Sequence, residues 1–205
     1  MKSARGTGED ERRRWNEKYR RKLREDVPQS PSELLVKHEA LLRSQVPGRA
    51  LDLACGLGRN AFYLARLGFT VEALDISEVA IAHVRRQAAA ERLNLRARIT
   101  DLQIESLPPA HYDVVVNCNF LVRRLFAQIK RTLAPGGVVL FETFLRDDPA
   151  FNHHSPDPEY FLEPGELLQA FKEFEILYYQ EGPKLTAANY RKVAILVARK
   201  AERRK

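Results

Sequence analysis

The sequence has 205 residues, of which 44% are hydrophobic and 30% are charged. That length suits one domain of ordinary size, and the apolar fraction is enough for a sizeable core, which argues against general disorder. No stretch approaches the roughly 20 apolar residues of a membrane-spanning helix, and the charged N-terminus lacks the apolar segment of a secretory signal. Cys55 and Cys118 form neither a disulfide framework nor a metal-ligand spacing, so we expect a cytoplasmic protein without a metal site.

The net charge of +7 is concentrated at the two ends of the chain. Residues 1–27 contain ten basic and six acidic residues, residues 191–205 contain seven basic and one acidic residue, and the middle therefore has a net charge of −3. Terminal charge is usually solvated, so it favours nucleic-acid binding only weakly without excluding it. We expect a basic N-terminal arm or lid over 1–27, one domain over 28–200 and a charged tail over 201–205.

The pattern along the chain predicts alternating strands and helices. Residues 1–14 resemble a disordered arm, Trp15 and Tyr19 follow at helical spacing, and Ser30 is the expected cap of a helix that ends at Pro47. From Ala50 onward, we expect strands at 50–53, 69–74, 96–99, 112–117 and 138–141, and helices at 60–67, 77–93 and 121–133. A loop over 144–163, a helix over 164–172 and strands at 174–180 and 192–198 complete the prediction. The fold class is therefore α/β, a mainly parallel seven-stranded sheet with an antiparallel C-terminal hairpin and helices on both faces.

Polar residues recur where the predicted strands end, which is where open α/β sheets bind ligands. Asp52 ends the first strand before the glycine turn, Asp75 ends the second, and Asp101 follows the third. The turn also fits a dinucleotide fingerprint, but two features argue against a dinucleotide. The negative charge of Asp52 would lie beside the pyrophosphate, and a pyrophosphate site does not call for the further carboxylate of Asp101. A ligand with an ammonium group, a ribose diol and an adenine amine fits three carboxylates better, and S-adenosylmethionine (SAM) is such a ligand.

Five segments resemble the motifs of class I SAM-dependent methyltransferases. Residues 51–60 (Leu-Asp-Leu-Ala-Cys-Gly-Leu-Gly-Arg-Asn) are similar to motif I, and the others are 74–77, 100–102, 112–116 and 133–137. Within that class, Arg59-Asn60-Ala61 and the Trp15-Asn16-x-x-Tyr19 opening resemble the small tellurite-resistance-type, thiopurine-methyltransferase-like enzymes. The resemblance covers roughly residues 45–145 and implies a Rossmann-like methyltransferase fold, SAM as cofactor and methyl transfer as the activity.

The predicted site combines cofactor-binding and catalytic residues. We assign the cofactor to Asp52, Ala54, Cys55, Gly56, Gly58, Asn60, Asp75, Ile76, Asp101, Leu102, Asn117 and Phe120. The catalytic candidates are Asn117, His153 or its neighbour His154, and Arg191. The resembled enzymes implicate histidine and arginine near the C-terminus, and this chain has no adjacent His-Arg pair there.

The acceptor is the open part of the prediction. Asn117-Cys118-Asn119-Phe120 lacks the two prolines that amino methyltransferases carry after the fourth strand, and no acid/base pair is evident, so a small soft nucleophile such as a thiol or a chalcogen oxyanion is favoured. An RNA or protein methyltransferase that uses the basic termini is the main alternative. A nicotinamide-binding reductase and a SAM-binding module without catalysis are lesser ones.

Overall fold

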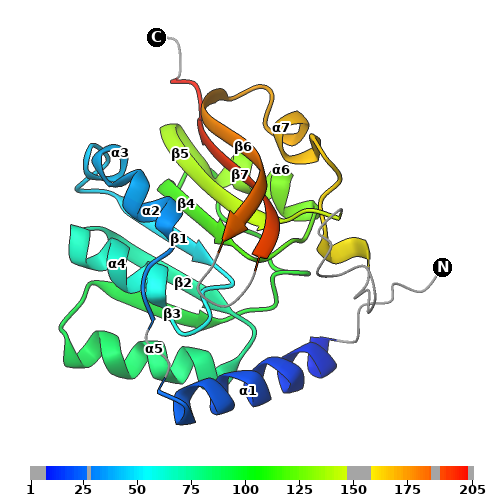
Figure 1. The fold of residues 1–205 in the computed structure, drawn as a ribbon. Helices are drawn as coiled ribbons and strands as arrows, with labels where there is room; N and C mark the ends of the chain where they lie inside the picture. The colour runs from blue at the N-terminus through cyan, green and yellow to red at the C-terminus, as the bar shows by residue number, and fades with distance from the viewer. Residues whose placement is uncertain (1–7, 27–28, 147–157, 186–189, 203–205) are drawn as a thin grey trace. The chain divides into compact units, whose positions relative to one another are not determined.

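Seven strands form one mixed sheet in the order β3-β2-β1-β4-β5-β7-β6 (Figure 1). The computed structural model describes residues 8–26, 29–146, 158–185 and 190–202. The chain divides into two compact units, Met1–Ser106 and Leu107–Lys205, called unit 1 and unit 2 below. The predicted seven-stranded α/β sheet with antiparallel C-terminal strands is confirmed.

Unit 1 contains three parallel strands and the helices that connect them. Its sheet elements are β1 (Arg49–Leu53), β2 (Thr70–Asp75) and β3 (Leu95–Ile99). Helix α4 (Arg59–Leu67) joins β1 to β2, and α5 (Glu78–Ala90) joins β2 to β3. Ala50 pairs with Val71 and Ala73 with Ala97 in parallel register. As predicted, Ser77 caps α5, because its hydroxyl accepts a hydrogen bond of 3.2 Å from the backbone N–H of Ala80.

The N-terminal segment is a helix earlier than predicted. Helix α1 (Gly8–Arg24) begins inside the segment that we expected to be a disordered arm, so that expectation is wrong for residues 8–14. The first turn of α1 is acidic and the last turn basic, which suits the helix dipole. Ion pairs one turn apart, such as Arg13 with Asp10 at 3.0 Å and Arg14 with Glu11 at 2.8 Å, add support. The helix lies alongside α5 (Figure 1).

The next predicted helix is two short ones. Helix α2 (Glu33–Lys37) and helix α3 (Glu39–Arg43) meet at His38, whose backbone is not helical, with φ −107° and ψ 23°. The cap of α2 is Ser32 rather than the predicted Ser30, since the hydroxyl of Ser32 accepts a hydrogen bond from the N–H of Leu34 at 3.3 Å. The buried leucines of the predicted stripe, such as Leu35, still form its core side.

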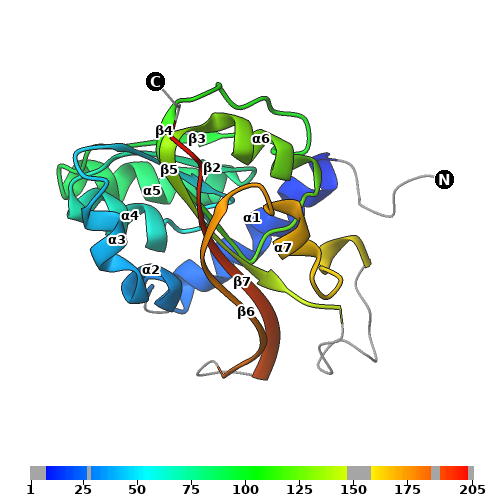
Figure 2. The ribbon, with the colours of Figure 1, turned by 90° about the horizontal axis from the view of Figure 1, so that it is seen from above.

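Unit 2 contains the other four strands. Its elements are β4 (Tyr112–Cys118), α6 (Arg124–Thr132), β5 (Leu133–Phe144), the 3-10 turn η2 (Pro158–Tyr160), α7 (Glu166–Ala170), β6 (Glu175–Leu185) and β7 (Tyr190–Arg199). Strands β4 and β5 are parallel, whereas β7 is antiparallel to both β5 and β6. The long β6–β7 pair twists strongly along its length (Figure 2). Residues 135–137, the expected turn, lie within the start of β5 instead.

Aromatic side chains fill the core of unit 2 between the sheet and its helices. The ring of Phe141 on β5 lies 5.7 Å from that of Phe126 on α6 and 6.3 Å from that of Phe171. Phe171 in turn lies 5.7 Å from Phe174. None of the helices in the described part of the chain is long and apolar enough to cross a membrane.

Candidate functional site

The glycine turn between β1 and α4 has a backbone that favours glycine. Gly56 and Gly58 have φ of 55° and 85°, and Ala54 also has a positive φ of 51°. A Cβ at Gly56 would lie 2.8 Å from the hydroxyl oxygen of Tyr19, and one at Gly58 would lie 2.8 Å from a methyl of Val84. Gly58 is therefore required by core packing, whereas Gly56 leaves space that the Tyr19 hydroxyl approaches.

Asp52, at the end of β1, is a buried carboxylate with one oxygen unsatisfied. The side chain is 1% exposed, and Oδ2 has no hydrogen-bond partner among the described residues. Burial raises the pKa of Asp52 to about 7, although the charge of Arg59 and a hydrogen bond from the backbone of Ala61 oppose the shift. A buried carboxylate oxygen without a donor is costly unless a ligand supplies one. The ammonium group of SAM is a suitable donor.

Asp75, at the end of β2, is held in place by the turn that it faces. Its Oδ2 accepts a hydrogen bond of 2.8 Å from the N–H of Gly56, and its Oδ1 accepts one of 2.8 Å from the N–H of Ser77. Burial raises the pKa of Asp75, while these two hydrogen bonds oppose the shift. Each carboxylate oxygen has a further lone pair, so the group can accept two ribose hydroxyls without losing its anchors.

Helix α1 is anchored to the start of α5 through Asn16, and Tyr19 approaches the Gly56 turn. The amide oxygen of Asn16 accepts from the hydroxyl of Ser77 at 2.7 Å and from the N–H of Val79 at 3.3 Å. Its amide nitrogen donates to Glu78 at 3.1 Å. Burial, followed by the nearby charge of Asp75, raises the pKa of Tyr19. The sequence predicts a contact by Trp15 and Tyr19 but assigns no role to Asn16, the buried polar residue between them.

The remaining cofactor candidates of unit 1 differ in how they are engaged. Oδ1 of Asp101 accepts from the N–H of Gln103 at 2.9 Å, which makes a local turn, whereas its Oδ2 points toward the start of α1 at Gly8. Leu102 is buried and Ile76 is half-buried. Asn60 has a structural role, because its amide oxygen accepts a hydrogen bond of 2.9 Å from the backbone N–H of Ser32.

Cys55 is a buried residue of the turn with no open reactive position. Its side chain is 8% exposed, and its sulfur contacts the carbonyl oxygen of Gly56 at 3.6 Å. Burial raises the pKa of the Cys55 thiol well above its usual value, and the charges of Asp52 and Asp75 act in the same direction. A thiol kept protonated in this way is a small apolar side chain rather than a nucleophile.

In unit 2 the end of β4 forms a closed turn. The amide nitrogen of Asn117 donates to the carbonyl oxygen of Phe120 at 2.7 Å, and Asn119, with φ of 57°, donates its N–H to the carbonyl of Glu142 at 2.8 Å. Asn117 is 1% exposed, while Phe120 is half-buried. The structure therefore places two predicted residues in one turn beside the end of β5.

A buried ion pair that the sequence analysis missed lies next to this turn. The Nζ of Lys184 on β6 lies 2.9 Å from both carboxylate oxygens of Glu142 on β5. The two side chains are 17% and 5% exposed. Arg191, a predicted catalytic residue, is the direct cross-strand partner of Lys184 on β7. His153 and His154, the other predicted catalytic residues, lie outside the described residues. Only the non-local pairing of three strands joins Glu142 to Lys184, so no local signal marks the pair.

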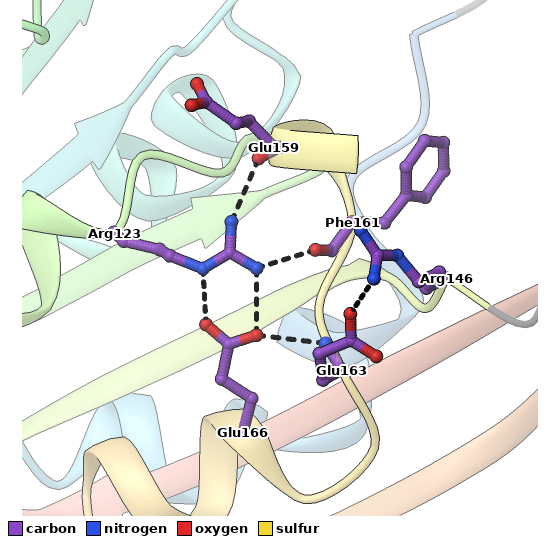
Figure 3. Close-up of polar contacts among 6 residues, drawn as sticks. All are labelled: Arg123, Arg146, Glu159, Phe161, Glu163 and Glu166. Carbon is purple, nitrogen blue, oxygen red and sulfur yellow. Dashed lines mark hydrogen bonds and ion pairs between the residues drawn. The ribbon is translucent and has the colours of Figure 1, made fainter. Parts of the chain in front are cut away.

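Arg123, just before α6, connects three parts of unit 2 (Figure 3). Its guanidinium binds both carboxylate oxygens of Glu166, at 2.6 and 2.9 Å, and donates to the carbonyls of Glu159 at 3.3 Å and Phe161 at 2.8 Å. Nearby, Arg146 pairs with Glu163. These contacts hold the segment 159–166 against the start of α6. No group of three or more metal-ligating side chains occurs in the residues that the structure describes.

Comparison with known proteins gives consistent results. Residues 50–137 match the family model of a methyltransferase domain. Hemagglutinin 1 of Eikenella corrodens is 31% identical over 153 residues, 72% of this chain and 50% of that protein. The "Probable S-adenosyl-L-methionine-dependent methyltransferase TehB" of Haemophilus influenzae is 30% identical over 143 residues, 66% of this chain and 49% of that protein. The chain thus spans about half the length of these curated relatives. The crystal structure of TehB from Haemophilus influenzae matches with a TM-score of 0.68 and 26% identity, covering 82% of this chain and 61% of that one.

Proposed function

Because this chain belongs to the class I SAM-dependent methyltransferases, we propose that it transfers the methyl group of SAM to a small acceptor with a soft nucleophilic atom. The observation that carries the proposal is the pair of buried carboxylates, Asp52 and Asp75, on either side of the glycine turn, one of them with an oxygen that no described residue satisfies. When bound, SAM supplies a methyl group activated by its positive sulfur. Its displacement needs orientation and exclusion of water more than a strong base.

The cofactor is assigned to unit 1 by the chemistry of each group. Asp52 accepts from the ammonium, and Asp75 accepts from the two ribose hydroxyls while it keeps its bonds to Gly56 and Ser77. Asp101 has one oxygen that is not used by its own turn, and with the backbone of Leu102 it is assigned to adenine. Helix α1 is the lid over this site, with Tyr19 at the Gly56 turn. Arginine and lysine are not needed here, because SAM carries no phosphate.

The acceptor is assigned to unit 2, and its chemistry follows from two features there. In an amino methyltransferase, carbonyl oxygens after the fourth strand hold the acceptor amine in a segment with two prolines, but this chain has Cys118 and Asn119 at those positions. Next to this turn, the ammonium group of Lys184 is partly buried against Glu142. A partly buried cation at this position favours an acceptor that reacts as an anion, such as a thiolate or a chalcogen oxyanion.

The first experiment is a set of calorimetric titrations with SAM, S-adenosylhomocysteine and NADH. Micromolar binding of the first two alone is expected, and binding of NADH instead would refute the cofactor assignment. Transfer of a radiolabelled methyl group is then measured on small thiols and chalcogen oxyanions, with total RNA and total protein in parallel. Label in a small product is expected, whereas label in RNA or protein would replace the small acceptor by a macromolecular one.

A variant of the Glu142–Lys184 pair tests the assignment of the acceptor side. Removing either charge alone would leave the opposite charge partly buried without the other member of the pair, so the matched change is the double variant Glu142→Gln/Lys184→Gln. It is expected to raise the KM for the acceptor severalfold while the affinity for S-adenosylhomocysteine stays the same. An unchanged KM would place the acceptor elsewhere.

A further inference from the structure

Unit 1 contains a cavity that the cofactor assignment does not use. It has a volume of about 270 Å³ and lies where the end of α1 meets α4 and α5. Its charged lining consists of Lys22, Arg59 and Arg66, with Asp26 as the one carboxylate. Phe62 is buried and forms an apolar part of the wall. We call this cavity the α1–α4 hollow.

Two of the three cations in the α1–α4 hollow form no ion pair within the described part of the chain, although the charge of Arg59 also acts on the buried carboxylate of Asp52. Lys22 and Arg59 are both half-buried, and neither forms an ion pair or hydrogen bond with any described residue. Arg66 differs, because its guanidinium binds Glu91 at 2.8 to 3.0 Å and its charge is thereby offset. Asp26 is exposed and makes no ion pair with either cation. The hollow is therefore a partly desolvated space with an excess of positive charge.

Like charges on α1 increase that excess. Arg14, Lys18 and Lys22 follow one another at four-residue spacing, so they lie on the same side of the helix. Burial lowers the pKa of Lys18, and the charges of Lys22, Arg14 and Arg21 lower it further. Arg14 is paired with Glu11 at 2.8 Å, so the repulsion acts mainly between Lys18 and Lys22, and an anion beside Lys22 relieves it.

We propose that the α1–α4 hollow binds a small multivalent oxyanion, either inorganic phosphate or pyrophosphate or the phosphoryl group of a small metabolite, between Lys22 and Arg59. Arginine and lysine donate charge-assisted hydrogen bonds to phosphoryl oxygens. The two side chains come from different elements, Lys22 from the end of α1 and Arg59 from the first residue of α4. A bound oxyanion therefore links the two elements.

This link has a consequence for the cofactor site, and that part rests on the proposed function. Lys22 lies three residues beyond Tyr19, whose hydroxyl approaches Gly56, and Arg59 follows Gly58 directly. An oxyanion held between Lys22 and Arg59 thus holds α1 down on the glycine turn. Binding of the oxyanion and of SAM is then mutually favourable, by the same factor in each direction.

The test is calorimetric titration of the full chain with inorganic phosphate, pyrophosphate and a hexose phosphate, at constant ionic strength and without SAM. One oxyanion is expected to bind per chain. Lys22→Gln and Arg59→Gln should each weaken binding roughly tenfold, the loss of one charge-assisted hydrogen bond. Arg21→Gln is the matched control, since it removes one charge from α1 outside the hollow, and it should bind as the unaltered chain does. Tighter binding of the hexose phosphate than of pyrophosphate would identify a metabolite as the source.

Two results would overturn the proposal. One is the absence of binding by all three anions, and the other is equal weakening by Arg21→Gln and Lys22→Gln, which would indicate diffuse attraction to a basic helix. The coupling is measured separately, as a severalfold gain in SAM affinity with saturating pyrophosphate that Lys22→Gln abolishes. If SAM does not bind at all, the proposed function fails while the anion titrations still decide the hollow.

Discussion

Replacing Asn16 by alanine should release α1 from the rest of unit 1. The side chain makes three hydrogen bonds, to Ser77, Val79 and Glu78, and is 5% exposed. Its removal leaves the Ser77 hydroxyl and the Val79 N–H without this acceptor, and each buried unsatisfied group costs roughly 1–3 kcal/mol. Undocking of α1 limits the total cost, because water then reaches both groups. We therefore expect a fall in Tm of several degrees together with an exposed α1.

Trp15 reports this undocking directly. It is the only tryptophan of the chain, and its ring stacks on Tyr19 with the centroids 5.6 Å apart. In Asn16→Ala its fluorescence emission should shift to the red, and acrylamide should quench it more strongly. Asn94→Ala is the matched control, because the amide of Asn94 is exposed and donates only to Thr70 at 2.8 Å; it should change neither Tm nor emission by much. Unaltered emission and quenching in Asn16→Ala would refute the anchoring role, because α1 would then be held by its apolar contacts alone.

Three further predictions concern the carboxylates and the glycine turn. Asp75→Asn should weaken the binding of SAM and of S-adenosylhomocysteine by the same factor, roughly tenfold or more, since both contain the ribose that Asp75 is assigned to bind; calorimetry measures both. The pKa of Asp52 is raised to about 7 in the folded chain, against about 3.9 unfolded, so its contribution to stability is full below about pH 4 and is lost as the pH rises through 7. Thermal unfolding from pH 4 to 8 should show this decline in stability, and the Asp52→Asn variant should show a weaker dependence of Tm on pH. S-adenosylhomocysteine should also bind more tightly at pH 7.5 than at pH 6, because its ammonium group interacts with the ionised carboxylate of Asp52. Gly58→Ala should lower the free energy of unfolding by roughly 1–3 kcal/mol in denaturant titrations, because of backbone strain and a clash of the added Cβ with Val84. Gly165→Ala is the control: its φ of 75° is similar, but no atom lies within 4 Å of the added Cβ, so the loss of stability should be smaller.

The features that the sequence predicted best are those with a local signal. Short β-branched runs marked the strands, and the acidic residues at their ends marked Asp52 and Asp75, because the strand end and the ligand edge coincide in this class of fold. The cap of α5 was equally local, since Ser77 immediately precedes the helix. Each of these assignments depends on neighbours within a few residues in the chain.

The features that were missed depend on distant partners. The start of α1 has no apolar stripe, so nothing in residues 8–14 distinguishes a charged arm from a helix docked by Asn16. Ser32 rather than Ser30 caps α2 because the N–H of Ser32 is held by Asn60, 28 residues away. Glu142 and Lys184 meet only through the order of β5, β7 and β6. Tertiary contacts decided each of these outcomes.

The hydrogen bond between Asn16 and Ser77 joins residues 61 positions apart, which has a consequence for synthesis on the ribosome. Helix α1 leaves the exit tunnel before the residues that anchor it, because β2 and the start of α5 follow later in the chain. In that interval the high density of charged residues on α1 keeps the segment soluble and protects the nascent chain from aggregation. Helix α1 therefore precedes β1 and β2 in synthesis but reaches its native position only after both of them.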